Sequence, residues 1–176
     1  RSDNLGPFVA GTMDTLSQIW RVGTRPMEIG GGFWVARHFS ANFGMFQYED
    51  PSAAGYISIE TTDDDAVFEP ETIMASGPHG GFRSPQPAIA FRLVEGDLDK
   101  GSSVTITYGD QRQGGPGIRL PTFESERMPL PLYVDLDGSS EWRSLPITPF
   151  VVIGGEAVGV HGFGPSIVEP GEIFEL

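Results

Sequence analysis

GDLDKGSSVTITYGD, residues 96–110, is the stretch that decides the fold class. It opens with polar turn residues, and Val104, Ile106 and Tyr108 then alternate with two threonines. Alternation with a period of two is typical of a β-strand that has one buried face. The sequence therefore predicts an all-β chain: an antiparallel β-sandwich of Ig-like or jelly-roll-like form, as one main domain with long loops.

The same kind of pattern recurs along most of the chain and predicts further strands. For residues 13–22, helical and strand spacing fit about equally well, and we favour a strand because the neighbouring sequence is β-rich. A closing hairpin is expected where the last apolar run turns back on itself. The expected strands are 13–22, 33–39, 56–62, 88–95, 118–123, 130–135 and 150–153, with 156–160 as the returning half of the hairpin.

Residues 63–86 contain three adjacent aspartates and several prolines, which predict a long loop. This loop is our first candidate to reach a neighbouring active site. We expect residues 1–164 to form the sandwich domain. Residues 165–176 read as a linker and the first strand of a following domain, so we expect the chain to be a piece of a longer protein.

The chain is strongly acidic: 24 Asp and Glu against 11 Lys and Arg give its 176 residues a net charge of −13. A surface of this sign repels nucleic-acid phosphates and anionic membranes, so neither is an expected partner. The absence of cysteine excludes disulfides, thiolate metal sites and cysteine nucleophiles. No apolar run approaches the roughly 18 residues that span a membrane. The oligomeric state is left open.

None of the histidines, His38, His79 and His161, has a second histidine three to five residues away, so no local metal-binding pair is predicted. Residues 97–101 and 135–138 each place two aspartates before a glycine, as calcium loops do. Neither supplies the later bidentate carboxylate of such a loop, so we expect turns stabilised by aspartate. No catalytic residue, metal ligand or cofactor is predicted in this chain.

Five side chains are candidate ligand-binding residues: Trp20, Trp34, His79, Arg112 and Arg119. The two tryptophans belong to an aromatic cluster that either stacks on sugars or, more often, packs in a core. The two arginines flank a glycine-rich loop that either holds an anion or forms a hairpin tip between two strands. For His79 a structural or surface role is favoured over a ligand-binding role.

Three stretches together resemble the N-terminal β region of a bacterial family of large domains of unknown function: residues 30–37, 101–110 with 114–119, and 160–172. In that family the β region precedes a metal-dependent hydrolase-like domain of the polymerase-and-histidinol-phosphatase (PHP) type. The resemblance implies a divalent metal in the downstream domain only, and the remainder of the polypeptide as partner. The compartment is left open between the bacterial cytoplasm and periplasm. No stretch matches the family's metal ligands, so no catalytic residue is carried over.

These observations lead to one main expectation about function. We expect a non-catalytic accessory β-sandwich domain that caps or helps bind substrate for a downstream metal-dependent hydrolase. The alternative is a stand-alone carbohydrate- or small-ligand-binding β module, suggested by the aromatic cluster and the acidic surface. A self-contained enzyme built from separate Asp and His loops is the third and least favoured class.

Overall fold

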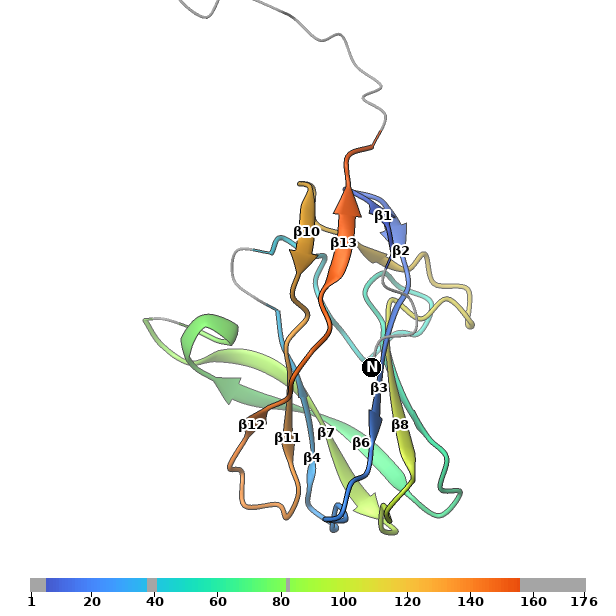
Figure 1. Cartoon of the computed structure of the whole chain (residues 1–176), viewed down its shortest axis with the longest axis vertical. Helices are drawn as coiled ribbons and strands as arrows, with labels where there is room; N and C mark the ends of the chain where they lie inside the picture. Colours follow the sequence, from blue (N-terminus) through green and yellow to red (C-terminus); the bar gives the residue numbers. More distant parts are fainter. Residues whose placement is uncertain (1–5, 38–40, 82, 156–176) are drawn as a thin grey trace, which may run out of the picture.

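The computed structural model describes residues 6–37, 41–81 and 83–155. Within these ranges the fold is all-β, as the alternating pattern predicts, with one short 3₁₀ turn and no α-helix (Figure 1). None of the described residues forms a helix long and apolar enough to cross a membrane. In chain order the elements are β1 (Phe8–Val9), β2 (Met13–Asp14), β3 (Leu16–Arg21), β4 (Gly32–Val35), β5 (Ile57–Thr61), β6 (Val67–Ala75), η1 (Gly77–His79), β7 (Gln86–Glu95), β8 (Ser103–Tyr108), β9 (Ile118–Arg119), β10 (Ser125–Met128), β11 (Leu132–Asp135), β12 (Arg143–Ser144) and β13 (Phe150–Ile153).

Two sheets enclose one core. Strands β12-β11-β4-β7-β6 form a five-stranded sheet, and β3-β8-β5 form a three-stranded one (Figure 1). The order is mirrored, because β7 lies between β4 and β6 just as β8 lies between β3 and β5. The chain therefore changes sheet at each step from β3 to β6 and again from β7 to β8, as in jelly-roll sandwiches, while β6 and β7 are neighbours in the five-stranded sheet. The β-sandwich prediction is confirmed, and its jelly-roll-like form fits this strand order.

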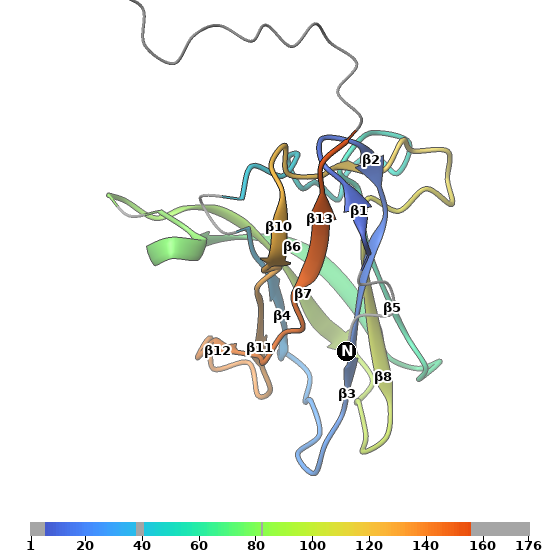
Figure 2. The same cartoon turned by 45° about the horizontal axis from the view of Figure 1, so that its top comes forward.

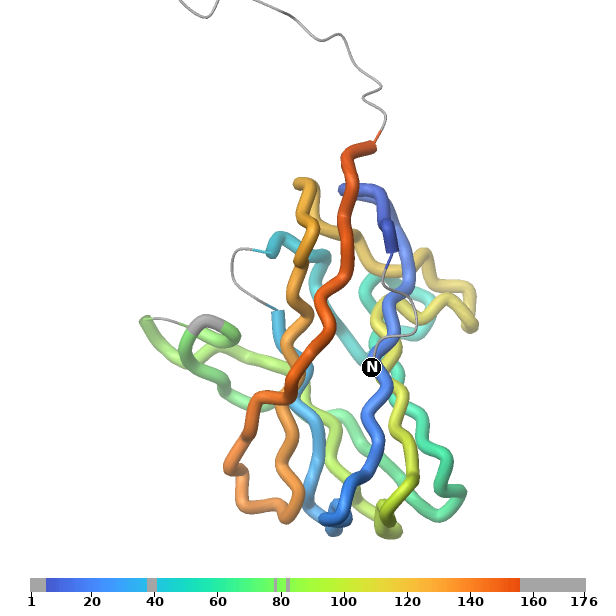
Figure 3. Tube along the Cα trace, viewed as in Figure 1, coloured from blue at the N-terminus to red at the C-terminus, as the bar shows by residue number. Residues whose placement is uncertain are grey.

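Two smaller sheets, β1-β13-β10 and β2-β9, extend one end of the sandwich, where the blue N-terminal and orange C-terminal strands run side by side (Figure 3). The β1–β13 pair is parallel, with Phe8 opposite Val152, whereas the other strand pairs are antiparallel. Phe8 and Phe150 meet edge to face, with ring centroids 5.6 Å apart. The strand predicted at 150–153 is thus confirmed as β13, a partner of both β1 and β10.

The core is built from the alternating positions that the sequence predicts. Val104, Ile106 and Tyr108 of β8 are fully buried, in one cluster with Phe33 from the five-stranded sheet. Trp20 of β3 packs edge to face on Phe33, with centroids 5.2 Å apart, so the two layers are in contact. Burial of each large apolar side chain contributes about 1.5–3 kcal/mol, which makes this face the main source of stability.

A buried glutamine joins the layers by hydrogen bonds. The Tyr108 hydroxyl donates to Gln18 Oε1 at 2.7 Å, and Gln18 Nε2 donates to the carbonyl of Leu130 at 2.8 Å. Both side-chain groups of Gln18 are therefore satisfied inside the core, which removes the cost of burying them. Burial raises the pKa of Tyr108, so its hydroxyl stays a donor at physiological pH.

The prediction of a long loop across residues 63–86 is wrong in the middle of this segment, where the chain forms a strand. Val67–Ala75 forms β6, which pairs with β7 in the longest hairpin of the described chain. Pro70 and the glutamates on either side of it obscured the alternation in the sequence. The structure tolerates them because β6 is the edge strand, where a missing N–H and outward charges cost little.

The hairpin-tip interpretation of the glycine-rich loop is also wrong, because β9 pairs with β2 and not with β8. Gly109 and Gly117, both at positive φ, turn the chain away at the two ends of the loop. The backbone there bonds to the turn before β5: Gly109 N–H donates to the Tyr56 carbonyl, and Gly55 N–H donates to the Gly117 carbonyl. The loop is therefore docked on a third segment.

The remaining strand predictions hold with shifted ends. Residues 13–22 form two strands, β2 and β3, and the predicted strand 33–39 ends early, at Val35. The strand predicted at 130–135 begins at Leu132, directly after Pro131, whose ring cannot continue a ladder. The hairpin at 156–160 and the linker and following strand expected at 165–176 lie outside the described residues.

Candidate ligand-binding site

The β6–β7 hairpin is longer than the strand beside it, and this difference creates the candidate site. The last β4–β7 pair joins Val35 to Ile89, whereas β6 and β7 stay paired as far as Ala75 and Gln86. The projecting part, residues 73–81 and 83–88, is called the arm here; it extends away from the sandwich with η1 near its tip (Figure 2). Among the described residues, no strand pairs with the arm on the side where β4 pairs with β7.

A cleft of about 630 Å³ lies where β4 ends and the arm continues. We call it the arm cleft. The segment 41–46 forms its opposite wall. The residues that line it include Ala36, Arg37, Phe46, His79, Gln86 and Ala88.

Arg37 is the cation of the arm cleft. Its Nη1 donates to the carbonyl of Phe43 at 3.2 Å and lies 3.5 Å from the carbonyl of Gly44. The guanidinium carbon lies 5.8 Å from the ring centroid of Phe46, at the range of a cation–π contact. Among the described residues no carboxylate forms an ion pair with Arg37. Partial burial lowers the pKa of Arg37.

An aromatic cluster covers the outer face of the five-stranded sheet beside the cleft. Trp34 of β4 stacks on Tyr133 of β11, with centroids 4.2 Å apart and planes 16° apart, and Trp142 meets Trp34 edge-on at 6.4 Å. His79 Nδ1 is hydrogen-bonded to the Tyr133 hydroxyl, so the arm is attached to this cluster. Burial raises the pKa of Tyr133, which keeps that hydroxyl protonated.

Trp34 carries the one buried side-chain donor without a partner in the described part of the chain. Its Nε1 is shielded from solvent and makes no hydrogen bond. The indole is only 7% exposed and packs with Ala36 and Ala75 in a cluster separate from the main core. Trp34 is thus the buried member of this aromatic cluster, and the half-buried rings of Tyr133 and Trp142 cover it.

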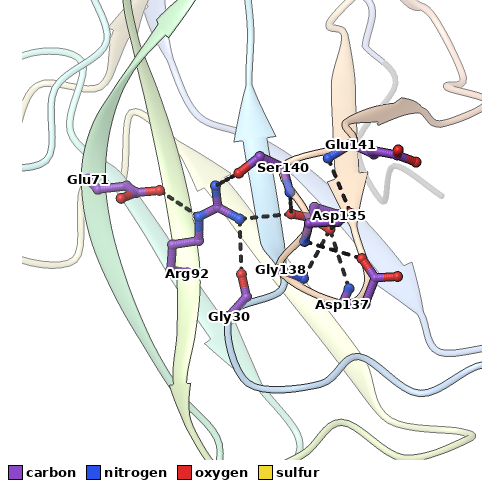
Figure 4. Close-up of polar contacts among 9 residues, drawn as sticks. Gly30, Glu71, Arg92, Asp135, Asp137, Gly138, Ser140 and Glu141 are labelled. Atoms are coloured by element: carbon purple, nitrogen blue, oxygen red, sulfur yellow. Dashed lines mark hydrogen bonds and ion pairs between the residues drawn. The ribbon is translucent and has the colours of Figure 1, made fainter.

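A second arginine, Arg92 of β7, is fully engaged on the same face (Figure 4). Its Nε donates to Glu71 at 2.6 Å, and its Nη1 donates both to Asp135 Oδ2 and to the Gly30 carbonyl, each at 2.9 Å. Its Nη2 lies 3.5 Å from Ser140 Oγ. Four elements of the chain are therefore joined by one guanidinium.

The close approach of the strands around Arg92 depends on a glycine, Gly32. Gly32 lies opposite both Arg92 and Asp135 in the sheet register. A Cβ at this position would clash with the carbonyl of Phe91, so only glycine lets β7 approach β4 so closely. Without a side chain between them, Arg92 and Asp135 meet across β4.

The predicted aspartate turn at 135–138 is confirmed. Asp135 Oδ1 accepts hydrogen bonds from the backbone N–H of Asp137 at 3.3 Å and Gly138 at 3.1 Å, and Oδ2 accepts one from Ser140 N–H at 2.8 Å (Figure 4). The Asp135 side chain is 1% exposed. Its carboxylate therefore fixes the loop after β11 and the arginine of β7 at once. At the other predicted turn, Ser102 N–H donates to the Asp99 carbonyl.

The five candidate residues from the sequence do not converge. Trp34 and His79 come together through Tyr133, while Trp20 lies between the two sheets against Phe33. Their role in ligand binding stays a prediction. His38 and His161 lie outside the described residues. In the described part of the chain no group of three or more His, Asp or Glu is placed to hold a metal ion.

Arg112 and Arg119 occupy other parts of the molecule. Arg112 forms ion pairs with Asp110 at 2.6 Å and with Glu60, and the Ser58 hydroxyl donates to the same Asp110 oxygen at 2.6 Å. The Arg112 guanidinium bound to Asp110 holds the pKa of that carboxyl well below its usual range. Arg119 is exposed on β9. Of the two arginines at the ends of this loop, Arg112 is therefore already neutralised by carboxylates of the chain.

Sequence reasoning did not select four residues of this region: Arg37, Arg92, Tyr133 and Trp142. Tyr133 and Arg92 are outward positions of strands that were predicted, so the alternation contained a signal for both. Arg37 and Trp142 lie beyond strand ends, where no periodicity applies. Their proximity to the others follows only from the sheet order.

No protein-family model, curated protein or solved structure matches this chain.

Proposed function

We propose that this chain is a non-catalytic β-sandwich module that binds a small organic ligand in the arm cleft. The observation that carries the proposal is the cleft lining, in which Arg37 lies beside the apolar surface of Ala36 and Ala88. No carboxylate of the described residues pairs with this arginine. A cleft of about 630 Å³ falls within the roughly 300–1,000 Å³ of small-molecule sites.

The contrast with the other charged clusters supports a binding role for the cleft. Arg92 and Arg112 are each held by two carboxylates, and a ligand would have to displace those contacts. Among the described residues, Arg37 has no carboxylate contact that a ligand would have to displace. The arm cleft is therefore the place where a ligand gains most from this chain.

Ring-bearing ligands, carbohydrates among them, are the class that fits best. Phe46 lines the cleft, and the half-buried rings of Tyr133 and Trp142 lie next to it through His79. Aromatic faces bind the faces of rings, while a few polar groups fix the orientation. This is the stand-alone binding module that the aromatic pattern suggested.

The accessory role for a metal-dependent hydrolase is the more specific form of the same proposal. It is supported by the three sequence stretches that resemble the N-terminal β region of that bacterial family. In such a protein the arm cleft would help bind substrate, and the metal would belong to the following domain. Cleaving the full-length protein at residue 176 tests this role: the two pieces should stay associated, and free separation with unchanged activity would contradict it.

Binding itself is tested by titrating the ¹⁵N-labelled chain with neutral and acidic mono- and disaccharides. Shifted amide resonances should gather at residues 36–37 and 86–89, where the cleft is lined by backbone as well as side chains. The variant Ala88→Leu, which fills the cleft, should abolish the shifts. The matched control is Ala54→Leu at an exposed turn position. Shifts spread elsewhere, or equal binding by both variants, would refute the cleft as the site.

A further inference from the structure

Arg37 lines the arm cleft and has guanidinium donors that no described residue accepts from. Among the described residues, the hydrogen bonds of its guanidinium are made by Nη1, to the carbonyls of Phe43 and Gly44. No described residue accepts a hydrogen bond from its Nε or Nη2. These two nitrogens carry parallel N–H groups, the side-on fork that matches the two oxygens of a carboxylate.

The charge distribution makes this arginine unusual. The chain carries a net charge of −13, so carboxylates are abundant. Four other arginines of the described residues form ion pairs with them: Arg25, Arg92, Arg112 and Arg143. The remaining described arginines, Arg21, Arg83, Arg119 and Arg127, form no ion pair either, but all four are exposed, whereas Arg37 is partly buried. A partly desolvated cation is costly unless an anion compensates it, and a bound ligand can supply that anion.

We propose that the ligand of the arm cleft carries a carboxylate, which the Nε and Nη2 edge of Arg37 binds in a bidentate manner. This inference rests on the proposed function, because it names the class of ligand for the same cleft. An acidic sugar satisfies both requirements: a ring to lie against Ala36, Ala88 and Phe46, and a carboxylate for the fork.

The position of the guanidinium is already fixed before a ligand binds. The carbonyls of Phe43 and Gly44 hold Nη1, and the ring of Phe46 lies 5.8 Å from the guanidinium carbon. An arginine held in this way loses little further side-chain entropy on binding. A singly charged carboxylate also suits the acidic chain better than a phosphate dianion, because repulsion from the net negative charge grows with the charge of the ligand.

The test compares D-glucuronate with its neutral counterpart D-glucose by isothermal titration calorimetry. D-glucuronate should bind at least tenfold more tightly, and Arg37→Gln should remove that preference while leaving the weak binding of D-glucose. The variant Arg21→Gln, on β3 of the other sheet, changes the net charge by the same amount and should keep the preference. Equal binding of both sugars by the wild-type chain would overturn the inference and leave the proposed function standing.

Two further measurements separate the fork from general anion attraction. Arg37→Lys keeps the charge but loses the two parallel N–H groups, so most of the preference should disappear. Inorganic phosphate should bind more weakly than D-glucuronate; equally tight binding would show a general oxyanion site and overturn the carboxylate assignment. Should Arg37→Gln disturb the segment 41–46, Ala88→Leu leaves the arginine intact and should remove D-glucuronate binding. Loss of neither sugar with Ala88→Leu would refute both the inference and the proposed function.

Discussion

Two arginines lie near opposite ends of β4 and have very different surroundings. Arg92, opposite Gly32 where β4 begins, binds two carboxylates and a carbonyl, with its guanidinium carbon 4.5 Å from the ring centroid of Trp142. Arg37, two residues beyond the end of β4, binds two carbonyls through a single nitrogen. Both are partly shielded from water. The guanidinium nitrogens of Arg92 are all in contact with acceptors of the fold, whereas Nε and Nη2 of Arg37 have no acceptor among the described residues.

The difference separates a structural arginine from one available to a ligand. The contacts of Arg92 come from β6, β11, and the segments before β4 and after β11, so its charge holds the outer face together. The contacts of Arg37 come from one short segment. We therefore expect substitutions at the first arginine to change folding, and substitutions at the second to change binding.

The largest effect is expected for Asp135→Ala. This change leaves Arg92 facing one carboxylate instead of two and frees the backbone N–H groups of the turn after β11. Removing one partner of a buried ion pair costs about 3–5 kcal/mol, and urea denaturation should show a loss of unfolding free energy in this range. Asp137→Ala, at an exposed carboxylate whose ion pair with Arg25 is screened by solvent, should cost much less. Equal losses for the two variants would contradict the buried role of Asp135.

Arg92→Gln and Arg37→Gln test the comparison directly. The first should lower the unfolding free energy by about 3 kcal/mol, because it leaves Asp135 buried without its counter-ion. The second should lower it by less than about 1 kcal/mol, because it removes two long hydrogen bonds to carbonyls and a distant cation–π contact with Phe46. Denaturation curves of both proteins under the same conditions measure this. If Arg37→Gln were the more destabilising of the two, the division into structural and binding arginines would be wrong.

The Asp110–Arg112 pair predicts a pH dependence of stability. The folded-state pKa of Asp110 is below its unfolded value of about 3.9, chiefly because Arg112 donates hydrogen bonds to it. Its contribution is therefore fully present above about pH 4 and is lost as the pH falls further, towards the folded-state pKa. The difference in unfolding free energy between the wild-type chain and Asp110→Asn should shrink between about pH 4 and pH 2. A constant difference over that range would refute this role.

The smallest effect is expected for Trp34→Phe. Phenylalanine keeps a ring to stack on Tyr133 and removes the buried Nε1 donor, which has no partner among the described residues. The two consequences oppose each other, so the stability should change by less than about 1 kcal/mol. Trp34→Ala, which leaves a cavity, should cost about 3–5 kcal/mol. Thermal or urea unfolding distinguishes the two, and a large loss for Trp34→Phe would mean that the indole nitrogen is satisfied in solution.

Much of the sandwich could be predicted from the sequence, because burial imposes a period of two on its inner strands. Val104, Ile106 and Tyr108 are all fully buried, as their alternation predicted. The edge strand β6 was not predicted, because the same burial pattern is weak there. Its side chains are largely exposed, so burial imposes little periodicity, and Pro70 interrupts what remains.

The candidate site was far less accessible to sequence reasoning. Trp34, His79 and Tyr133 are separated by tens of residues, and only the order of β11, β4 and β7 brings them together. The partners of Arg92 could not be predicted either, because they also come from segments that are far apart in the sequence. The turn at Asp135 was predictable because its bonds are local, within five residues along the chain. Local chemistry could thus be predicted, whereas long-range convergence needed the topology.

The proline and the charge on β6, which obscured this strand in the sequence, also affect how the protein behaves at high concentration. An open edge strand is a template on which a second chain can add a strand and begin aggregation. Pro70 interrupts the row of donors along that edge, and the exposed Glu69 places a negative charge beside it in every copy. Two such edges repel each other instead of pairing. The irregular composition of β6 therefore protects the long, projecting hairpin from self-association.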